Sequence, residues 1–372
     1  MDQLWGNRAA SSEAAVAQRH LRPLWGLPGT QLGVVAWPSE RRDRLFGTWH
    51  YWWQAHLLDC LIDAQLRDPQ PHRLTEIKRQ ARSHHLRNVR WTNSYYDDMA
   101  WLALALERAA RLPGVEPSRA LPKFADQFLN AWAPDEGGGI PWRKERLKED
   151  RFFNAPANGP AGIFLARYGD HLGRAEQMGD WIDQKLIDPD THLVFDGIKN
   201  GSLVRPQYTY CQGVVLGLET ELAARTGAEA RDRHAARVHR LVVAVSEHMA
   251  PSGVLQGAGG GDGGLFAGIT ARYLALVATD LPGESADDAV ARDTARSIVL
   301  ASAKAAWDNR QPVDGLPLFG AFWDRPAELP TQGGQRAQFV AGAVNASETP
   351  ERDLSVQLSG WMLMEAAGKV TA

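Results

Sequence analysis

The sequence has few cysteines, no excess of basic charge and no long apolar run, and each deficit excludes a class of protein. Only Cys60 and Cys211 are present, so a disulfide framework is excluded and a cysteine-based metal site is not expected. Both thiols are expected to be buried and free. The formal net charge of −3 leaves no basic footprint for nucleic acid and no polybasic patch for an anionic membrane.

Targeting, phosphate-binding and metal-binding patterns are also missing. No apolar run follows a basic start within Met1–Arg22, and no signal peptide or membrane span is predicted anywhere. No glycine-rich stretch carries the Lys and Ser/Thr of a phosphate loop, and no His, Asp or Glu group has metal-ligand spacing. As written, the chain is expected to be a cytoplasmic monomer without metal or cofactor. It would be extracytoplasmic if the sequence was trimmed before Met1.

Tryptophan is present in unusual number. There are 14, and Trp37, Trp91, Trp142 and Trp323 stand beside glycine, proline or polar residues in expected loops. Tryptophan packs well in cores, so a structural role is one interpretation. Because sugar rings present flat apolar C–H faces that stack on aromatic rings, a tryptophan-rich cleft also favours a carbohydrate ligand.

Hydrophobic periodicity predicts that almost every long segment is helical, with few and short strands. Some segments, such as 119–132 and 229–249, are amphipathic and should have one side in water. Others, such as 95–111 and 208–226, are apolar nearly all round and should be buried. The expected helices span residues 11–22, 49–67, 74–87, 95–111, 119–132, 156–169, 171–186, 208–226, 229–249, 263–279, 285–307 and 352–367.

Six buried helices that alternate with six half-exposed ones predict an all-α fold, an (α/α)6 barrel of about twelve helices. We expect a single catalytic domain over residues 1–372. Small residues on the buried helices allow close contacts, as Gly162, Gly213, Gly217 and Gly268 would. A generic all-α or solenoid fold is the alternative, but no fixed-period repeat supports it.

The inner helices of such a barrel run parallel, so the residues that precede them should meet at one mouth. The unusual residues of this sequence lie there, in the stretches Trp49–His56, Asn93–Asp98, Asn154–Pro160, Tyr208–Gln212 and Gly259–Gly264. The opposite mouth collects basic residues that are expected to act as ordinary helix caps, namely Arg108, Arg111, Arg167 and Arg225.

Two consecutive carboxylates, Asp97 and Asp98, stand at the start of one of the buried helices. Adjacent acids at a helix start are often plain N-terminal caps. Here the helix is apolar on all sides, so at least one carboxylate must point inward, and burying an unpaired carboxylate is costly. Neighbouring side chains easily reach the separation of about 5 Å that retaining glycoside hydrolysis requires. The pair therefore favours glycosidic bond cleavage.

Seven segments together resemble glycoside hydrolase family 76, the α-1,6-mannanases, in the family's order over roughly residues 45–365. They include the catalytic Asp-Asp segment, the first inner helix and the glycine-rich loop that ends in tryptophan. The remaining segments are helix starts and an Asp-Gly turn. The segments are Tyr51–His56, Tyr95–Trp101, Gly137–Arg143, Asn158–Ala161, Phe195–Ile198, Tyr208–Gly213 and Gly261–Phe266.

The resemblance implies an (α/α)6 barrel and a retaining, endo-acting hydrolase of α-1,6-linked mannan or mannooligosaccharide. It implies that Asp97 is the nucleophile and Asp98 the general acid/base. The residues implied to line the sugar site or lie beside it are Tyr96, Trp142, Asn158, Asp196, Tyr210, Gln212 and Asp262.

Structural roles are open for several of these residues. Asn158 could be a helix cap and Asp262 a turn residue in a flexible loop, whereas Gln212 could satisfy backbone groups in the core. Tyr96 and Trp142 could simply pack. Cys211 departs from the family pattern, which usually has an asparagine or similar polar residue there.

Two other functions compete with the hydrolase. Another (α/α)6 enzyme, such as a sugar epimerase or unsaturated glucuronyl hydrolase, remains possible on sequence grounds. An epimerase would use histidine as acid and base, with His50, His56 and His192 as candidates, although each is also compatible with an ordinary structural histidine. A non-catalytic mannan-binding protein is the third hypothesis, which the retention of both carboxylates disfavours.

Overall fold

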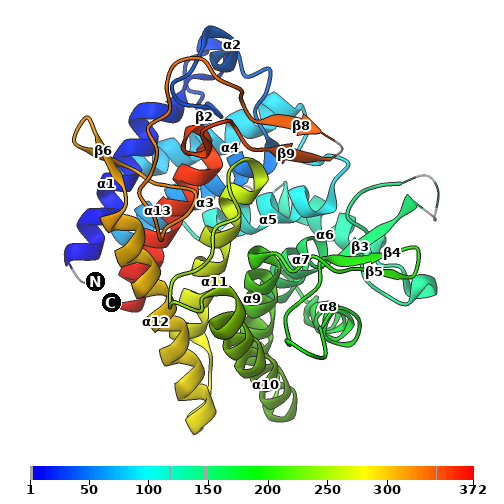
Figure 1. Cartoon of the computed structure of the whole chain (residues 1–372). Coiled ribbons are helices and arrows are strands. Elements are labelled where there is room, and N and C mark those ends of the chain that lie inside the picture. Colours follow the sequence, from blue (N-terminus) through cyan, green and yellow to red (C-terminus); the bar gives the residue numbers. More distant parts are fainter. Residues whose placement is uncertain (1–2, 117–118, 146, 148–149, 341) are drawn as a thin grey trace.

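The computed structural model describes residues 3–116, 119–145, 147, 150–340 and 342–372. Helices dominate, and six of them are buried on all sides and form a closed ring in which each contacts the next and the last contacts the first (Figure 1). This ring confirms the predicted (α/α)6 barrel. The inner helices are α3 (Tyr51–Arg67), α5 (Tyr96–Ala110), α7 (Ala155–Arg167), α9 (Thr209–Arg225), α11 (Phe266–Asp280) and α13 (Leu354–Val370).

The outer helices alternate with the inner ones along the chain and bury one face each, as their amphipathic patterns predict. No helix in the described residues is long and apolar enough to cross a membrane. The outer helices are α1 (Gln3–His20), α4 (Pro71–Asn88), α6 (Leu121–Ala131), α8 (Leu172–Lys185), α10 (Ala228–Ala244) and α12 (Ala286–Asp308).

Short elements fill the connections. A four-residue helix, α2 (Arg41–Arg44), precedes the first inner helix, and a short 3-10 turn, η5 (Gly261–Leu265), leads into α11. Within the described residues, the strands form four small antiparallel sheets. These are β1 (Leu21–Arg22) with β2 (Leu32–Gly33), β3 (Phe152–Asn154) with β4 (Gly197–Lys199) and β5 (Ser202–Val204), β6 (Gln311–Val313) with β7 (Leu316–Leu318), and β8 (Gln338–Val340) with β9 (Ala343–Asn345).

Glycines on the inner helices permit the close contacts that the sequence predicts. A methyl group added at Gly213 would lie 2.8 Å from the Cα atom of Thr270 on α11, and one at Gly268 would lie 2.6 Å from the Cα atom of Ser359 on α13. Real Cβ atoms do not approach other atoms this closely, so only glycine fits at these two positions. The spacing between neighbouring inner helices therefore depends on them.

The first helix differs from its predicted span of 11–22. It begins at Gln3, eight residues earlier, and ends at His20, because Leu21 and Arg22 pair with β2 as strand β1. Its buried face carries Trp5 and Ala9 as well as small residues further along. That sparse, small-residue stripe is weakly apolar, which is why periodicity alone placed the start too late.

Four inner helices begin with the same side-chain arrangement, which we call the amide clamp. In each, the fourth residue of the helix is an asparagine or glutamine. Its side-chain oxygen accepts a hydrogen bond from the backbone N–H of one residue in another segment of the chain, and its side-chain nitrogen donates one to the C=O of that same residue. The same amide donates to a backbone carbonyl just before or at the start of its own helix. All twelve bonds measure between 2.7 and 3.0 Å, and the clamps are Gln54 on Gly33, Asn158 on Ile140, Gln212 on Val194 and Gln357 on Phe319.

The clamps explain how loops that run over the barrel are held in place. Each clamp supplies the hydrogen bonds of a buried loop residue that belongs to no long strand, and buried backbone groups need such partners. The clamped loops therefore enter the mouth of the barrel at fixed positions beside the starts of the inner helices.

The arginines of the opposite mouth lie at the C-terminal ends of their helices, as expected of caps, and Arg225 donates to the carbonyl of Glu221, but all of them also pair with carboxylates. Arg108 ion-pairs with Asp59 and Asp63 of α3, and Arg272 of α11 pairs with the same two carboxylates. The remaining predicted caps, Arg111, Arg167 and Arg225, pair with Glu107 or Glu221. The arginines therefore form ion pairs with carboxylates of the inner ring. The pairs of Arg108 and Arg167 connect different helices.

Removing one clamp should destabilise the barrel measurably. We expect Gln357→Leu to lower the free energy of unfolding by roughly 2–4 kcal/mol, because three buried backbone groups lose their partner. Gln184→Leu on the exposed side of α8 is the matched control and should change stability by less than about 0.5 kcal/mol. Urea unfolding followed by circular dichroism measures both; equal stabilities would contradict a structural role for the clamp.

Candidate active site

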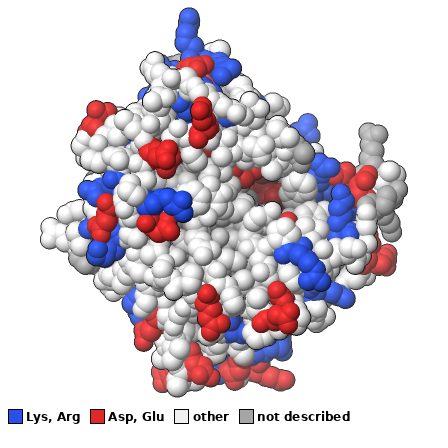
Figure 2. Space-filling view, in the orientation of Figure 1, with Lys and Arg blue, Asp and Glu red and all other residues white. Residues whose placement is uncertain are grey.

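A pocket of about 540 Å³ opens at the mouth where the inner helices begin. Figure 2 shows it as a hollow on this face with acidic atoms at its bottom. The starts of α3, α5, α9 and α11, the residue before α7 and the hairpin β8–β9 all contribute to its wall. The predicted convergence of polar and aromatic residues at one mouth is thus confirmed.

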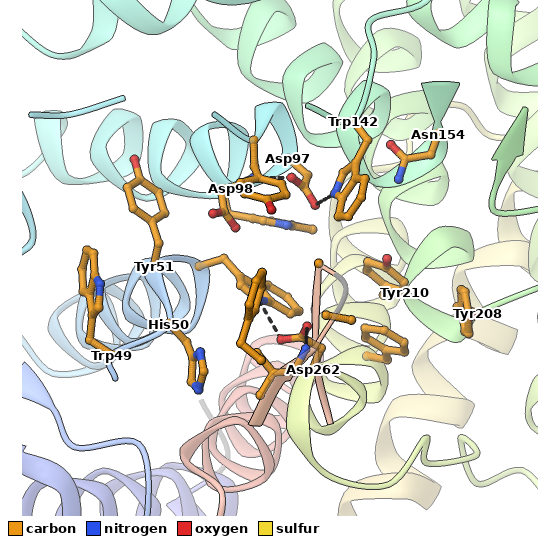
Figure 3. Close-up of a pocket in the computed structure, with 18 of the residues that line it drawn as sticks. Trp49, His50, Tyr51, Asp97, Asp98, Trp142, Asn154, Tyr208, Tyr210 and Asp262 are labelled. Atoms are coloured by element: carbon orange, nitrogen blue, oxygen red, sulfur yellow. Dashed lines mark hydrogen bonds between the residues drawn. The ribbon is translucent and has the colours of Figure 1, made fainter. Parts of the chain in front are cut away.

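The carboxylates of Asp97 and Asp98 both line this pocket (Figure 3). Asp97 accepts from the indole N–H of Trp142 at 2.8 Å and from the backbone N–H of Asp98 at 2.9 Å. Asp98 accepts from the side-chain amide of Asn93 at 2.6 Å, and Asn93 in turn accepts from the N–H of Tyr95. Both side chains are therefore oriented by fixed donors, not by bulk water.

The surroundings of the pair favour the retention of a proton at neutral pH. Burial raises the pKa of Asp97 to about 7, although the hydrogen bonds from Asp98 and Trp142 oppose the shift. Burial and the charge of Asp97 raise the pKa of Asp98 well above its ordinary value. Two carboxyls this close do not both ionise readily, so the state with one ionised and one protonated group is favoured.

Asp262 lies across the pocket from the pair, in the turn η5 (Figure 3). The indole N–H groups of Trp52 and Trp53 both donate to one of its oxygens at 2.9 Å, and the backbone N–H of Val344 donates to the other at 2.7 Å. Burial raises the pKa of this carboxyl, against the three hydrogen bonds. Asp262 is therefore held rigidly and does not behave as a mobile turn residue.

Asp196 also lines the pocket, from the loop before β4. The one side-chain contact described for its carboxyl is the Cys211 thiol, 3.9 Å away, and burial raises the pKa of Asp196 to about 7. A thiol is a weak donor, so the carboxyl keeps acceptor capacity for a ligand hydroxyl.

Aromatic rings form much of the remaining wall. Tyr210 stacks on Phe266 with ring centroids 3.9 Å apart and an angle of 9° between the planes, and Trp52 stacks on Trp101 at 6.3 Å. Trp101 and Phe266 were not among the site residues that the sequence predicted. The signal that could have found Trp101 is its place one helical turn after Asp97, which puts the two on the same side of α5.

Three predicted substrate-binding residues do not line this pocket. Asn158 and Gln212 are fully buried amide clamps, whose polar groups are used on backbone, so the expected contact with a sugar does not fit their positions. Tyr96 lines a neighbouring cavity of about 310 Å³ instead, where Lys144 lies over its ring. Tyr95, the residue just before α5, lines the main pocket in its place.

The three candidate histidines of the epimerase hypothesis are separated. His50 lines the pocket, His56 is buried against the rings of Trp52 and Trp101, and His192 is exposed elsewhere. Burial lowers the pKa of His50 to about 4, so its imidazole is neutral at neutral pH. The arrangement of paired histidines that would serve as acid and base in the pocket is therefore not formed by these residues.

The hairpin β8–β9 connects the two acidic sides of the pocket. At one end, Val344 donates to Asp262, and at the turn Gly342 lies directly against the ring of Trp142, the donor to Asp97. Gly342 has a φ of +98°, and a Cβ atom there would lie 2.5 Å from the Trp142 ring. Nothing in the sequence predicted this contact.

The fold and the pocket together define a helical barrel with a ligand-sized acidic cavity at the mouth of its inner ring. The chain belongs to glycosyl hydrolase family 76, whose sequence model matches residues 8–353. No curated protein sequence matches it.

Solved structures resemble the chain over nearly its full length. The α-1,6-mannanase of Salegentibacter sp. HEL1_6 has 27% identity and a TM-score of 0.79 over 98% of this chain and 99% of that one. An inactive variant of that enzyme, with two consecutive aspartates changed to asparagine, was solved with α-1,6-mannotriose and has 26% identity, the same TM-score and the same coverage. The Lin0763 protein of Listeria innocua shares the fold at 24% identity and TM-score 0.79, over 99% of this chain and 97% of that one.

A methyl group at position 342 should disturb the carboxylate pair through Trp142. We expect Gly342→Ala to lower kcat/KM by about tenfold or more, because the displaced indole no longer orients Asp97. Gly315→Ala in the β6–β7 turn is the matched control, since its φ is also positive at +76° but open space surrounds it. Steady-state kinetics on an α-1,6-linked mannooligosaccharide compares them, and equal activities would contradict the contact.

Replacing Asp196 should stabilise the protein at neutral but not at acidic pH. Because folding raises this pKa, the folded state holds the proton more tightly, and the cost to stability grows as pH rises from about 4 towards 7. We expect Asp196→Asn to raise the free energy of unfolding by roughly 1–2 kcal/mol at about pH 8 and to leave it unchanged near pH 4. Urea unfolding at both pH values checks this; a gain of the same size at both would point to another cause.

Proposed function

We propose that the protein is a retaining, endo-acting hydrolase of α-1,6-linked mannan or mannooligosaccharides. The single observation that carries the proposal is the adjacent pair Asp97 and Asp98, half-buried side by side in the wall of the pocket and held by different donors. The pocket is built from one chain, and we expect the protein to act as a monomer.

The roles of the two carboxyls follow from their partners. Asp97 accepts two hydrogen bonds, from Trp142 and from the Asp98 amide, which favour its ionised form and make it the nucleophile. Burial, together with the charge of Asp97, keeps the proton on Asp98, which can then deliver it to the leaving oxygen. Adjacent residues readily place their carboxyls about 5 Å apart, the separation typical of retaining enzymes.

The reaction then proceeds in two displacements. Asp97 attacks the anomeric carbon while Asp98 protonates the departing oxygen, which leaves a covalent mannosyl ester on Asp97. Asp98, now ionised, removes a proton from a water that attacks the same carbon and releases Asp97. Two inversions give net retention.

The other pocket groups would bind the sugar. Asp196 has free acceptor capacity for a hydroxyl, and the stacked Tyr210 and Phe266 offer an apolar face beside it. Asp262 fixes the indole of Trp52, and Trp142 fixes the carboxylate of Asp97, so both shape the pocket around the reacting carbon. The relative whose double variant at two consecutive aspartates is inactive, and was solved with α-1,6-mannotriose, supports a catalytic function of the pair and the substrate class.

Asparagine variants test the assignment. We expect Asp97→Asn and Asp98→Asn each to lower turnover of α-1,6-mannan by roughly three orders of magnitude or more, with unchanged circular dichroism. The exposed Asp293→Asn is the matched control and should keep full activity. Near-normal activity of either variant would remove that residue from its role, and a wild-type protein that binds oligomannoside but never cleaves it would establish the non-catalytic alternative.

A further inference from the structure

The rim of the pocket carries an exposed aromatic ring with no ring partner among the described residues. Phe339 of β8 is 59% exposed and lines the pocket. Its neighbour Val340 is 51% exposed but does not line the pocket. An aromatic side chain left in water beside a ligand cavity commonly marks a binding surface.

The position of this ring is fixed by the hairpin that carries it. Phe339 pairs directly with Val344 across the two strands, and directly opposed residues share one face of a hairpin. The backbone N–H of Val344 donates to Asp262. Just after β9, the backbone N–H of Ser347 donates to the buried carboxylate of Asp353, which also accepts from the N–H of Gly261. Because side chains alternate along a strand, Val340 is directed to the other face.

We propose that Phe339 forms an outer subsite, a platform on which a mannosyl unit of the same glycan stacks beyond the units that occupy the bottom of the pocket. The inference rests on the proposed function, since it takes its ligand to be an α-1,6-linked mannooligosaccharide. Asp262, Val344 and Phe339 line the same pocket, and a hydrogen bond and a strand pair connect them in that order. A glycan bound at Asp97 and Asp98 can therefore extend to this ring.

This arrangement makes the subsite dependent on chain length. A short oligosaccharide that fills only the bottom of the pocket does not reach Phe339, whereas a longer one gains a stacking contact. The contact is made in both the ground state and the transition state, so it lowers KM more than it raises kcat.

The test compares Phe339→Ala with Val340→Ala on α-1,6-linked mannotriose and mannohexaose. We expect Phe339→Ala to lower kcat/KM for the hexaose by about three- to tenfold, through KM, and to change the value for the triose by less than twofold. Val340→Ala should behave as wild type on both, and Phe339→Trp should retain the preference for the hexaose.

Two outcomes would overturn the proposal. One is an equal effect of Phe339→Ala and Val340→Ala on the hexaose, and the other is an equal loss on both substrates, which would indicate disturbance of Asp262 through the hairpin. Calorimetric binding of mannohexaose to the full-length wild type and to Phe339→Ala separates this question from the proposed function. If the wild type binds but does not cleave, the proposed function fails, while a three- to tenfold weaker affinity of Phe339→Ala still supports the subsite.

Discussion

The partial burial of two adjacent carboxylates at the start of one inner helix is the constraint on which the site depends. Water would stabilise Asp97 and Asp98 as two anions, but the wall of the pocket replaces that water with a small set of fixed donors. Burial raises the pKa of both carboxyls, which favours one proton on the pair near neutral pH, whereas a fully exposed Asp-Asp sequence would be doubly ionised. The proposed division into nucleophile and acid rests on that environment more than on the residue types alone.

The barrel supplies this environment through its topology and its clamps. Parallel inner helices bring their N-terminal ends to one mouth, and the amides of Gln54, Asn158, Gln212 and Gln357 fix the loops that surround it. Arginine–carboxylate pairs at the other mouth satisfy the charges of the inner ring there. The two mouths are thus chemically different, although the middle parts of the helices that connect them are mostly apolar.

Much of the fold was predictable because its signal is local. A segment that is apolar all round, such as the α5 segment, can only be buried, and six such segments alternating with amphipathic ones leave few architectures. The acidic pair was predictable for the same reason. The exact start of α5 was less predictable. Tyr95 is the extended residue before the helix and lines the pocket, whereas Tyr96, the first helical residue, lies outside it.

Other features depend on contacts that sequence does not encode locally. An amide at the start of a buried helix has the same sequence pattern whether it binds sugar or backbone, so Asn158 and Gln212 were expected in the site and are clamps instead. The hairpin β8–β9 is too short to give a strand pattern, and its contacts with Asp262 and Trp142 join residues far apart in the chain. Arg108 and Arg167 have the pattern of helix caps, and only the folded ring shows their partners.

The anomeric configuration of the first product tests the central claim most directly. Proton NMR during early hydrolysis of an α-1,6-linked mannooligosaccharide resolves the new reducing end before it mutarotates. Adjacent carboxyls that act as nucleophile and acid predict that the α anomer appears first. Initial release of the β anomer would mean that a water attacks directly, and it would contradict a covalent role for the Asp97–Asp98 pair.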